Sequence, residues 1–243
     1  MKNVVEVENV TMNFNMTKEK IDSIKEYFVK LLKGKLLYNE FTALSDISFS
    51  VKKGEVLGII GLNGAGKSTL LKIISGILKP TEGEVKISGS ISPLIELGAG
   101  FDLDLTAREN IFLNGYVLGY SKKYIQEKFN EIVEFSELND FLDVPIKNFS
   151  SGMVARLGFS IATTVKPDIL IVDEILAVGD YKFKEKCEAR IAEMMAGGTT
   201  VIIVSHTIDQ IKKLCDRVMW LEEHKIKMIG NAHEICELYQ GKQ

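Results

Sequence analysis

Cysteine is scarce in this sequence, and long apolar runs are absent. The cysteines Cys187, Cys215 and Cys236 have no C-x-x-C spacing, so neither a metal site nor a disulfide framework is expected, and we interpret them as reduced core or surface residues. No uncharged apolar stretch reaches the roughly 18 residues of a membrane-spanning helix. The acidic Glu6 falls where a signal peptide would have its apolar core. We therefore expect a cytosolic chain that does not cross a membrane by itself.

A strong excess of one charge is also absent. The chain has 30 Lys and Arg against 33 Asp and Glu, a net charge of −3, so nucleic acid is not an expected partner. With 243 residues, 46% of them hydrophobic and 26% charged, the composition is that of a folded protein. This length fits one α/β domain, or one domain with an inserted lobe.

The hydrophobic pattern predicts strands at both ends of the chain and helices in the middle. A helix is expected at about Lys67–Ser75, ended by Gly76, and the pattern over about 105–164 is helical. Short runs rich in Val and Ile are typical of buried strands. The expected strands are Val4–Glu8, Ala43–Val51, Glu55–Ile60, Gly83–Ile87, Ile169–Val172 and Thr200–Val204. A mostly helical segment therefore interrupts an α/β sheet domain.

The stretch 16–40 differs from its surroundings. It contains six lysines against four acids. The apolar residues that fall on one face of a helix are Ile21, Ile24, Phe28, Leu31 and Leu32. Two interpretations remain open. One is a surface helix packed on the sheet, and the other is an amphipathic helix on the cytosolic membrane surface or against a membrane partner.

The strongest motif is a phosphate-binding loop at residues 61–68, which match G-x-x-x-x-G-K-[ST] at every position. An apolar strand enters this loop and a helix leaves it, so backbone N–H groups and the helix N-terminus can face phosphate oxygens. We expect Lys67 to reach the β- and γ-phosphates as a catalytic residue, and Ser68 to ligate Mg²⁺. The residues expected to bind nucleotide here are Gly61, Leu62, Asn63, Gly64, Ala65, Gly66, Lys67, Ser68 and Thr69.

A second site element follows the apolar run 169–172. Asp173 lies at the carboxyl end of this predicted strand, where ligands of α/β folds bind, and would hold Mg²⁺. Glu174 is then placed to polarise an attacking water as general base. His206, one strand further on, can reach the γ-phosphate and this water. The remaining histidines, His224 and His233, are interpreted as plain surface residues.

Together with the segment Phe149–Met153, which reads F-S-S-G-M, these motifs resemble the nucleotide-binding subunits of ATP-binding cassette (ABC) transporters. The resemblance implies an α/β fold: a P-loop NTPase (RecA-like) core with N-terminal antiparallel β elements and an inserted α-helical subdomain. It covers residues 1–243 as a single nucleotide-binding domain. The implied core is about 1–93 and 165–243, the helical lobe about 94–164, and the amphipathic insertion about 16–40.

The resemblance also implies a homodimer in which two ATP molecules are sandwiched. The relaxed signature Ser150, Ser151 and Gly152 would contact the γ-phosphate held by the partner's phosphate loop, and Asp180 matches the aspartate of the family's D-loop. The usual glutamine before the helical lobe is missing, and Glu96 is the nearest candidate for its place near Mg²⁺. By position, the aromatic ring that stacks on adenine should be Phe14, with Phe41, beyond the insertion, as the rival; a role in the core remains open for each ring.

Further segments resemble the exporters of teichoic acid and O-antigen polysaccharide, namely 92–101, Arg108–Ile111 and 173–180, and so does the insertion. The implied function is that of an ATPase that drives export of a lipid-linked polysaccharide through a separate transmembrane permease, from the cytoplasmic face of the membrane. We expect no C-terminal carbohydrate-binding domain. The alternatives are a soluble ABC-type ATPase, or a transporter subunit for another substrate. A P-loop kinase would lack the signature, and no N-K-x-D motif of a GTPase is present.

Overall fold

The computed structural model describes residues 2–17, 38–95, 97–98, 100–164, 166–173, 180–205 and 207–242. The expected amphipathic helix within 16–40 therefore lies outside the described residues, except at its two ends. Those ends are strand, because β1 (Asn3–Thr17) and β2 (Tyr38–Lys52) pair up to Met16 opposite Asn39 and Thr17 opposite Tyr38.

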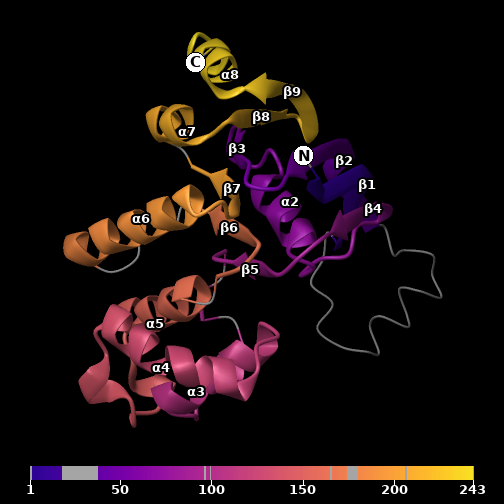
Figure 1. Cartoon of the computed structure of the whole chain (residues 1–243). Coiled ribbons are helices and arrows are strands. Elements are labelled where there is room, and N and C mark those ends of the chain that lie inside the picture. Colours follow the sequence, from indigo (N-terminus) through magenta and orange to yellow (C-terminus); the bar gives the residue numbers. More distant parts are fainter. Residues whose placement is uncertain are drawn as a thin grey trace, which may run out of the picture.

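A six-stranded sheet in the order β5-β6-β7-β3-β8-β9 forms the centre of the molecule (Figure 1). All neighbours are parallel except β8 and β9, which form an antiparallel hairpin. The strands β3 and β7 are buried at every position, as expected for parallel strands covered on both faces. The strand bounds are β3 Val56–Ile60, β5 Ile91–Pro93, β6 Ile169–Asp173, β7 Thr200–Val204, β8 Arg217–Glu222 and β9 Lys225–Asn231.

A second sheet is antiparallel and has the order β2-β1-β4. Together with helix α2 (Lys67–Ile74), it packs on one side of the central sheet. Strand β4 spans Glu82–Ile87. Strand β1 is longer than the predicted Val4–Glu8, because its pairing continues beyond an irregularity. Asn9 has a φ of 50° and the register shifts between Val7 and Val10, so the alternation of apolar and polar residues breaks there.

The predicted helical middle of the chain is three helices and two 3₁₀ turns. Threonine and serine start the first two helices: Thr106 forms a capping box with Glu109, and the Ser121 hydroxyl accepts from the Tyr124 N–H. We call α3, α4 and α5 with their connections the helical lobe. The bounds are α3 Ala107–Val117, α4 Lys122–Ser136, η1 Asn139–Phe141, η2 Ile146–Asn148 and α5 Ser151–Thr164.

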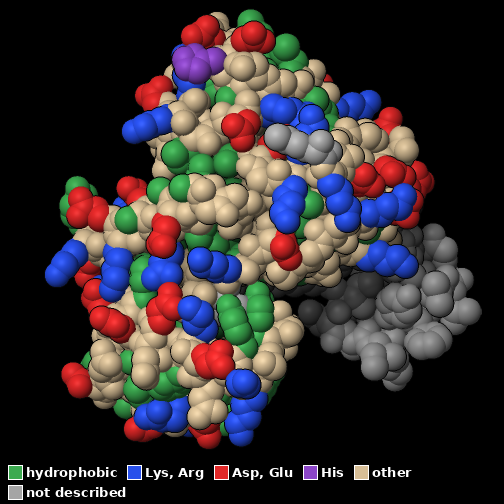
Figure 2. Space-filling model, viewed as in Figure 1, with side chains coloured by type: hydrophobic (Ala, Val, Ile, Leu, Met, Phe, Trp, Pro, Cys, Tyr) green, Lys and Arg blue, Asp and Glu red, His purple; other side chains and the backbone are tan. Residues whose placement is uncertain are grey.

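Among the described residues, three further helices follow the helical lobe, and one of them lies beside it. Helix α6 runs next to the lobe, and α7 and α8 lie near the β8–β9 hairpin (Figure 1). Figure 2 shows Lys, Arg, Asp and Glu side chains interspersed over α6 and the helical lobe. The bounds are α6 Tyr181–Ala196, α7 Ile208–Leu214 and α8 Ala232–Gln240.

The central sheet separates two hydrophobic clusters. Leu57 and Ile59 of β3 point into the cluster shared with β1, β2 and α2, whereas Val56 and Ile60 point to the cluster shared with α6, α7 and α8. A third cluster fills the helical lobe around Ile111. The parallel sheet, the phosphate-loop strand and the inserted helices confirm the predicted α/β P-loop fold.

The three cysteines are free thiols. Cys187 and Cys236 are buried and Cys215 is partly buried. Burial raises the pKa of the Cys187 and Cys215 thiols to about 12, so both stay protonated and unreactive. Within the described part of the chain, none of the helices combines the length and the apolarity that crossing a bilayer requires.

Candidate functional site

The loop between β3 and α2 is shaped by its glycines. Gly61, Gly64 and Gly66 have φ values of 149°, 83° and 102°, which side-chain-bearing residues rarely adopt. A Cβ atom on Gly61 would lie 2.2 Å from the carbonyl oxygen of Leu221, and one on Gly66 would lie 2.5 Å from that of Ala43. The loop is therefore packed backbone against backbone at both ends, with no room for a side chain there.

Helix α2 begins directly at the end of this loop. Its N-cap is Gly66, which has no side chain to accept a bond from the first N–H groups of the helix. Those N–H groups and the positive end of the helix dipole face the region of the loop, which is the arrangement that binds phosphate in many proteins.

Lys67 is nearly buried, and its ammonium group lies against the loop. The Nζ atom donates to the carbonyl oxygens of Gly61 at 2.7 Å and Leu62 at 3.0 Å. Only 8% of the residue is exposed. The side chain thus ties both sides of the loop together and brings a positive charge to the place where phosphate oxygens would bind.

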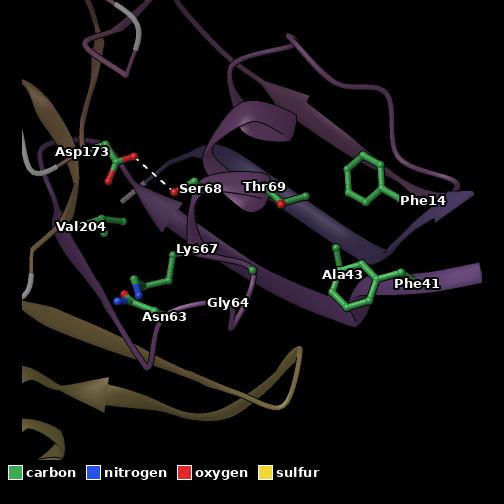
Figure 3. Close-up of a pocket in the computed structure, with 11 residues that line it drawn as sticks. Phe14, Phe41, Ala43, Asn63, Gly64, Lys67, Ser68, Thr69, Asp173 and Val204 are labelled. Carbon is green, nitrogen blue, oxygen red and sulfur yellow. Dashed lines mark hydrogen bonds between the residues drawn. The ribbon is translucent and has the colours of Figure 1, made fainter. Parts of the chain in front are cut away.

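Ser68 and Asp173 meet from different elements. Ser68 is in the first turn of α2 and Asp173 ends β6, and the Ser68 hydroxyl donates to Oδ2 of Asp173 at 3.4 Å (Figure 3). A hydroxyl and a carboxylate oxygen side by side are the hard ligands that Mg²⁺ prefers. The donor set therefore fits this cation, and it lies beside the phosphate loop.

The phosphate loop borders a cavity of about 450 Å³. This volume is within the range of roughly 300–1,000 Å³ that is typical of small-molecule sites. Polar groups occupy one end and aromatic rings the other (Figure 3). The lining residues are Phe14, Phe41, Ala43, Asn63, Gly64, Gly66, Lys67, Ser68, Thr69, Asp173 and Val204.

Both candidate rings for the base lie in this cavity. Phe14 and Phe41 are directly opposite each other across the β1–β2 pair. Phe14 is partly buried and packs against the core cluster of β1, β2 and α2, whereas Phe41 is 40% exposed. The structure brings both rings to the pocket, so the two alternatives from the sequence are neighbours.

The predicted signature residues lie elsewhere. Ser150 caps α5, because its hydroxyl oxygen accepts from the N–H of Met153 at 3.2 Å; Ser151 is the first residue of that helix and Gly152 the second. Ser150 and Ser151 are exposed. None of these residues lines the cavity described above.

Asp180 caps helix α6 and is joined to the signature helix. Its Oδ1 accepts from the N–H of Phe183 at 2.9 Å, and its Oδ2 accepts from Nη2 of Arg156. The N–H donor of Phe183 holds the pKa of the Asp180 carboxyl below its ordinary value, and Arg156 contributes in the same direction.

Arg156 also donates to Glu137 at the end of α4 and lies over the Phe183 ring, so it connects three helices. The sequence interpretation did not identify Arg156.

Three predicted site residues lie outside the described part of the chain: Glu96, Glu174 and His206. The interpretation of His224 is wrong. His224 is a partly buried residue whose ring contacts Phe41 and whose Nδ1 lies 3.1 Å from the carbonyl oxygen of Ala43, so it is not a plain surface residue. Nothing in its local sequence signals this, because both contacts are far away along the chain.

Comparison with known proteins identifies the family of the chain. The family model described as "ABC transporter" matches residues 44–177. The O-antigen export system ATP-binding protein RfbB of Klebsiella pneumoniae is 45% identical over 246 residues, which cover 99% of this chain and 98% of the relative. The teichoic acids export ATP-binding protein TagH of Listeria monocytogenes serotype 4b is 42% identical over 239 residues, covering 98% of this chain and 70% of the relative.

A solved structure has the same fold. The dimeric structure of an ATP-binding cassette in a post-hydrolysis state, bound to ADP and Pi, has a TM-score of 0.72 and 24% identity, covering 94% of this chain and 98% of that chain. This likeness concerns the fold alone. The family model and the relatives confirm the family resemblance that the motifs predicted.

Proposed function

Because the chain belongs to the ABC transporter family, we propose that it is the ATP-hydrolysing subunit of an exporter of lipid-linked polysaccharide, of the O-antigen or teichoic acid type. The observation that carries this proposal is the convergence of the phosphate loop, Lys67 and the Ser68–Asp173 pair on one end of a cavity whose other end is aromatic. The substrate class is supported by relatives that match nearly the whole chain and are named for export of these polymers.

ATP fits the polarity of the pocket. Loop N–H groups and the ammonium group of Lys67 would bind the phosphates, and the base would stack at the Phe14–Phe41 end. Ser68 and Asp173 would hold Mg²⁺, which neutralises phosphate charge when bound. Thr69, directly after Ser68, also lines the cavity.

The catalytic assignments follow the sequence. Glu174 directly follows Asp173, and would orient the attacking water and accept its proton. His206, two residues after the end of β7, would contact the γ-phosphate. The place of Glu96 near Mg²⁺ is part of the same proposal.

The signature residues favour a dimer. Ser150, Ser151 and Gly152 lie at an exposed helix start away from the chain's own cavity, so they are available to close over ATP on a second copy. We propose a homodimer that acts with a separate transmembrane permease, peripheral to the cytoplasmic face of the membrane. The core is about 1–93 and 165–243, and the helical lobe of about 94–164 passes the movement to the permease. The segment 16–40 would contact the membrane or the permease.

Glu174→Gln tests the mechanism in one experiment. Removal of the base should slow hydrolysis at least tenfold, while the variant remains able to bind ATP and accumulates as an ATP-bound dimer. The measurement is phosphate release together with light scattering in Mg·ATP, with and without the permease. Glu127→Gln, an exposed change on α4, is the matched control and should behave as wild type.

Two results would contradict the proposal. Normal turnover of Glu174→Gln would remove Glu174 as the base. Unimpaired surface display of polysaccharide in cells that lack the chain would remove the export role.

A further inference from the structure

The turn between β8 and β9 reaches back to the pocket. Glu223 and His224 have φ values of 49° and 64°, the left-handed pair typical of tight hairpin turns. This turn directs the imidazole onto β2. The N–H of Ser45 donates to the carbonyl oxygen of His224 at 2.9 Å, and Nδ1 of His224 lies 3.1 Å from the carbonyl oxygen of Ala43. A carbonyl oxygen only accepts, so Nδ1 carries the hydrogen in this bond.

One of these contacts, at Ala43, falls on the wall of the cavity. Ala43 lines the cavity, and its carbonyl oxygen is the atom that a Cβ on Gly66 would meet. At the other end of the loop, Leu221 in β8 presents its carbonyl oxygen to Gly61. The β8–β9 hairpin therefore supports the phosphate loop and β2 together, from outside the cavity.

The ring of His224 also contacts Phe41. The two ring centroids are 5.4 Å apart and the planes meet at 85°, an edge-to-face arrangement that stabilises aromatic pairs. Phe14 is held by packing against the core, but Phe41 is 40% exposed. An exposed ring without support would have to be ordered when a ligand binds, and that ordering costs affinity.

We infer that His224 is a positioning residue for the base end of the nucleotide pocket: it holds Phe41 and the β2 segment at Ala43 so that the Phe41 ring stacks on the base. This inference rests on the proposed function, since it assumes that the ligand is a nucleotide. It adds a residue from a distant hairpin to the pocket, and it gives Phe41 a role in base binding beside Phe14.

His224→Asn is the informative variant. Asparagine tolerates a positive φ, so the turn should persist while the ring contact with Phe41 is lost. The measurement is calorimetric binding of ATP and of inorganic tripolyphosphate, each with Mg²⁺. ATP affinity should fall about three- to tenfold while tripolyphosphate affinity stays constant, because only the base contact weakens. His233→Asn, at an exposed histidine of α8, is the matched control and should change neither affinity.

Two further variants keep the inference open to refutation. His224→Tyr retains an aromatic ring and should recover part of the ATP affinity at the same melting temperature. In a Phe41→Ala background, His224→Asn should have no further effect on ATP binding, since its target is gone.

The outcomes separate the two proposals. Equal losses of ATP and tripolyphosphate, or an undiminished effect in the Phe41→Ala background, would overturn the positioning role. A wild-type protein that binds tripolyphosphate no more weakly than ATP would show that the base is not bound at all. A wild-type protein that binds neither would instead contradict the proposed function.

Discussion

The phosphate loop and the contact between the helical lobe and α6 are held in different ways. At the loop, carbonyl oxygens of Leu221 and Ala43 lie where any side chain on Gly61 or Gly66 would be. At the contact between α4, α5 and α6, side chains join the helices: the buried rings of Phe135, Phe159 and Phe183 pack together, and charged groups form bonds around them. Arg156 donates to Glu137 and Asp180, and Lys186 also donates to Glu137.

The difference concerns how each region tolerates change. A backbone-packed loop allows one residue type at each critical position, so one substitution disrupts its whole shape. A network of side-chain bonds distributes its stabilisation, so one substitution removes one part. The ring of Phe135 also contributes to this network, because the charged groups of Lys186 and Arg190 both lie 4.7 Å from its centroid and can interact with its face.

The largest effect is expected for Gly61→Ala. A Cβ at 2.2 Å from the Leu221 carbonyl forces the loop or β8 to move, and the φ of 149° adds strain. We expect a loss of about 2–4 kcal/mol in the free energy of unfolding and at least tenfold weaker ATP binding. Gly64→Ala is the control, because no atom lies within 4 Å of its Cβ position. It should cost about 1 kcal/mol in urea unfolding. Equal effects of the two changes would contradict backbone packing as the cause.

Arg156→Ala should have an intermediate effect. The side chain is only 18% exposed and binds two carboxylates as well as the face of the Phe183 ring. Urea unfolding should show a loss of about 1–3 kcal/mol. Lys147→Ala, at an exposed pair with Asp104, should cost less than about 1 kcal/mol. If the two losses were the same, the contact between lobe and α6 would not depend on Arg156.

The smallest effect is expected for Glu137→Gln, and it concerns how the free energy of unfolding depends on pH. The hydrogen bond from Lys186 holds the pKa of Glu137 below its ordinary value of 4.5, and Arg156 acts in the same direction. Because the folded pKa is lowered, this carboxylate stabilises the fold above pH 4.5, and the contribution is lost as the pH falls through the folded pKa. Urea unfolding between about pH 6 and pH 3 should show a shallower loss for Glu137→Gln than for wild type. If the stability of the two proteins fell equally with pH, protonation of Glu137 would not weaken the network.

The two regions also differ in how well the sequence predicts them. The loop could be predicted because its chemistry requires fixed residue types at fixed spacing, from Gly61 to Ser68. The Arg156 network could not, because it joins residues from three helices, and single charges carry no local signal of their partners. His224 was missed for the same reason.

Strands with an uninterrupted local pattern were predicted well, and strands without one were not. The strands at Val56–Ile60 and Thr200–Val204 are continuous apolar runs, and their predicted positions are correct within a residue. Most of β1 was missed, because the left-handed Asn9 and the register shifts hide its alternation. The short β5 has too few residues to show a period.

The ladder between β1 and β2 has a consequence for how this protein can diverge. It fixes Thr17 directly opposite Tyr38, so the two ends of the connection 18–37 are neighbours whatever its length. The entropy cost of closing a chain between two fixed points grows slowly with length, by about 0.6 kcal/mol for each doubling. Insertions and deletions can therefore accumulate between these residues while Phe14 and Phe41, three positions inside the ladder on either side, keep their register. The ladder thus sets the register of the pocket independently of how many residues join Thr17 to Tyr38.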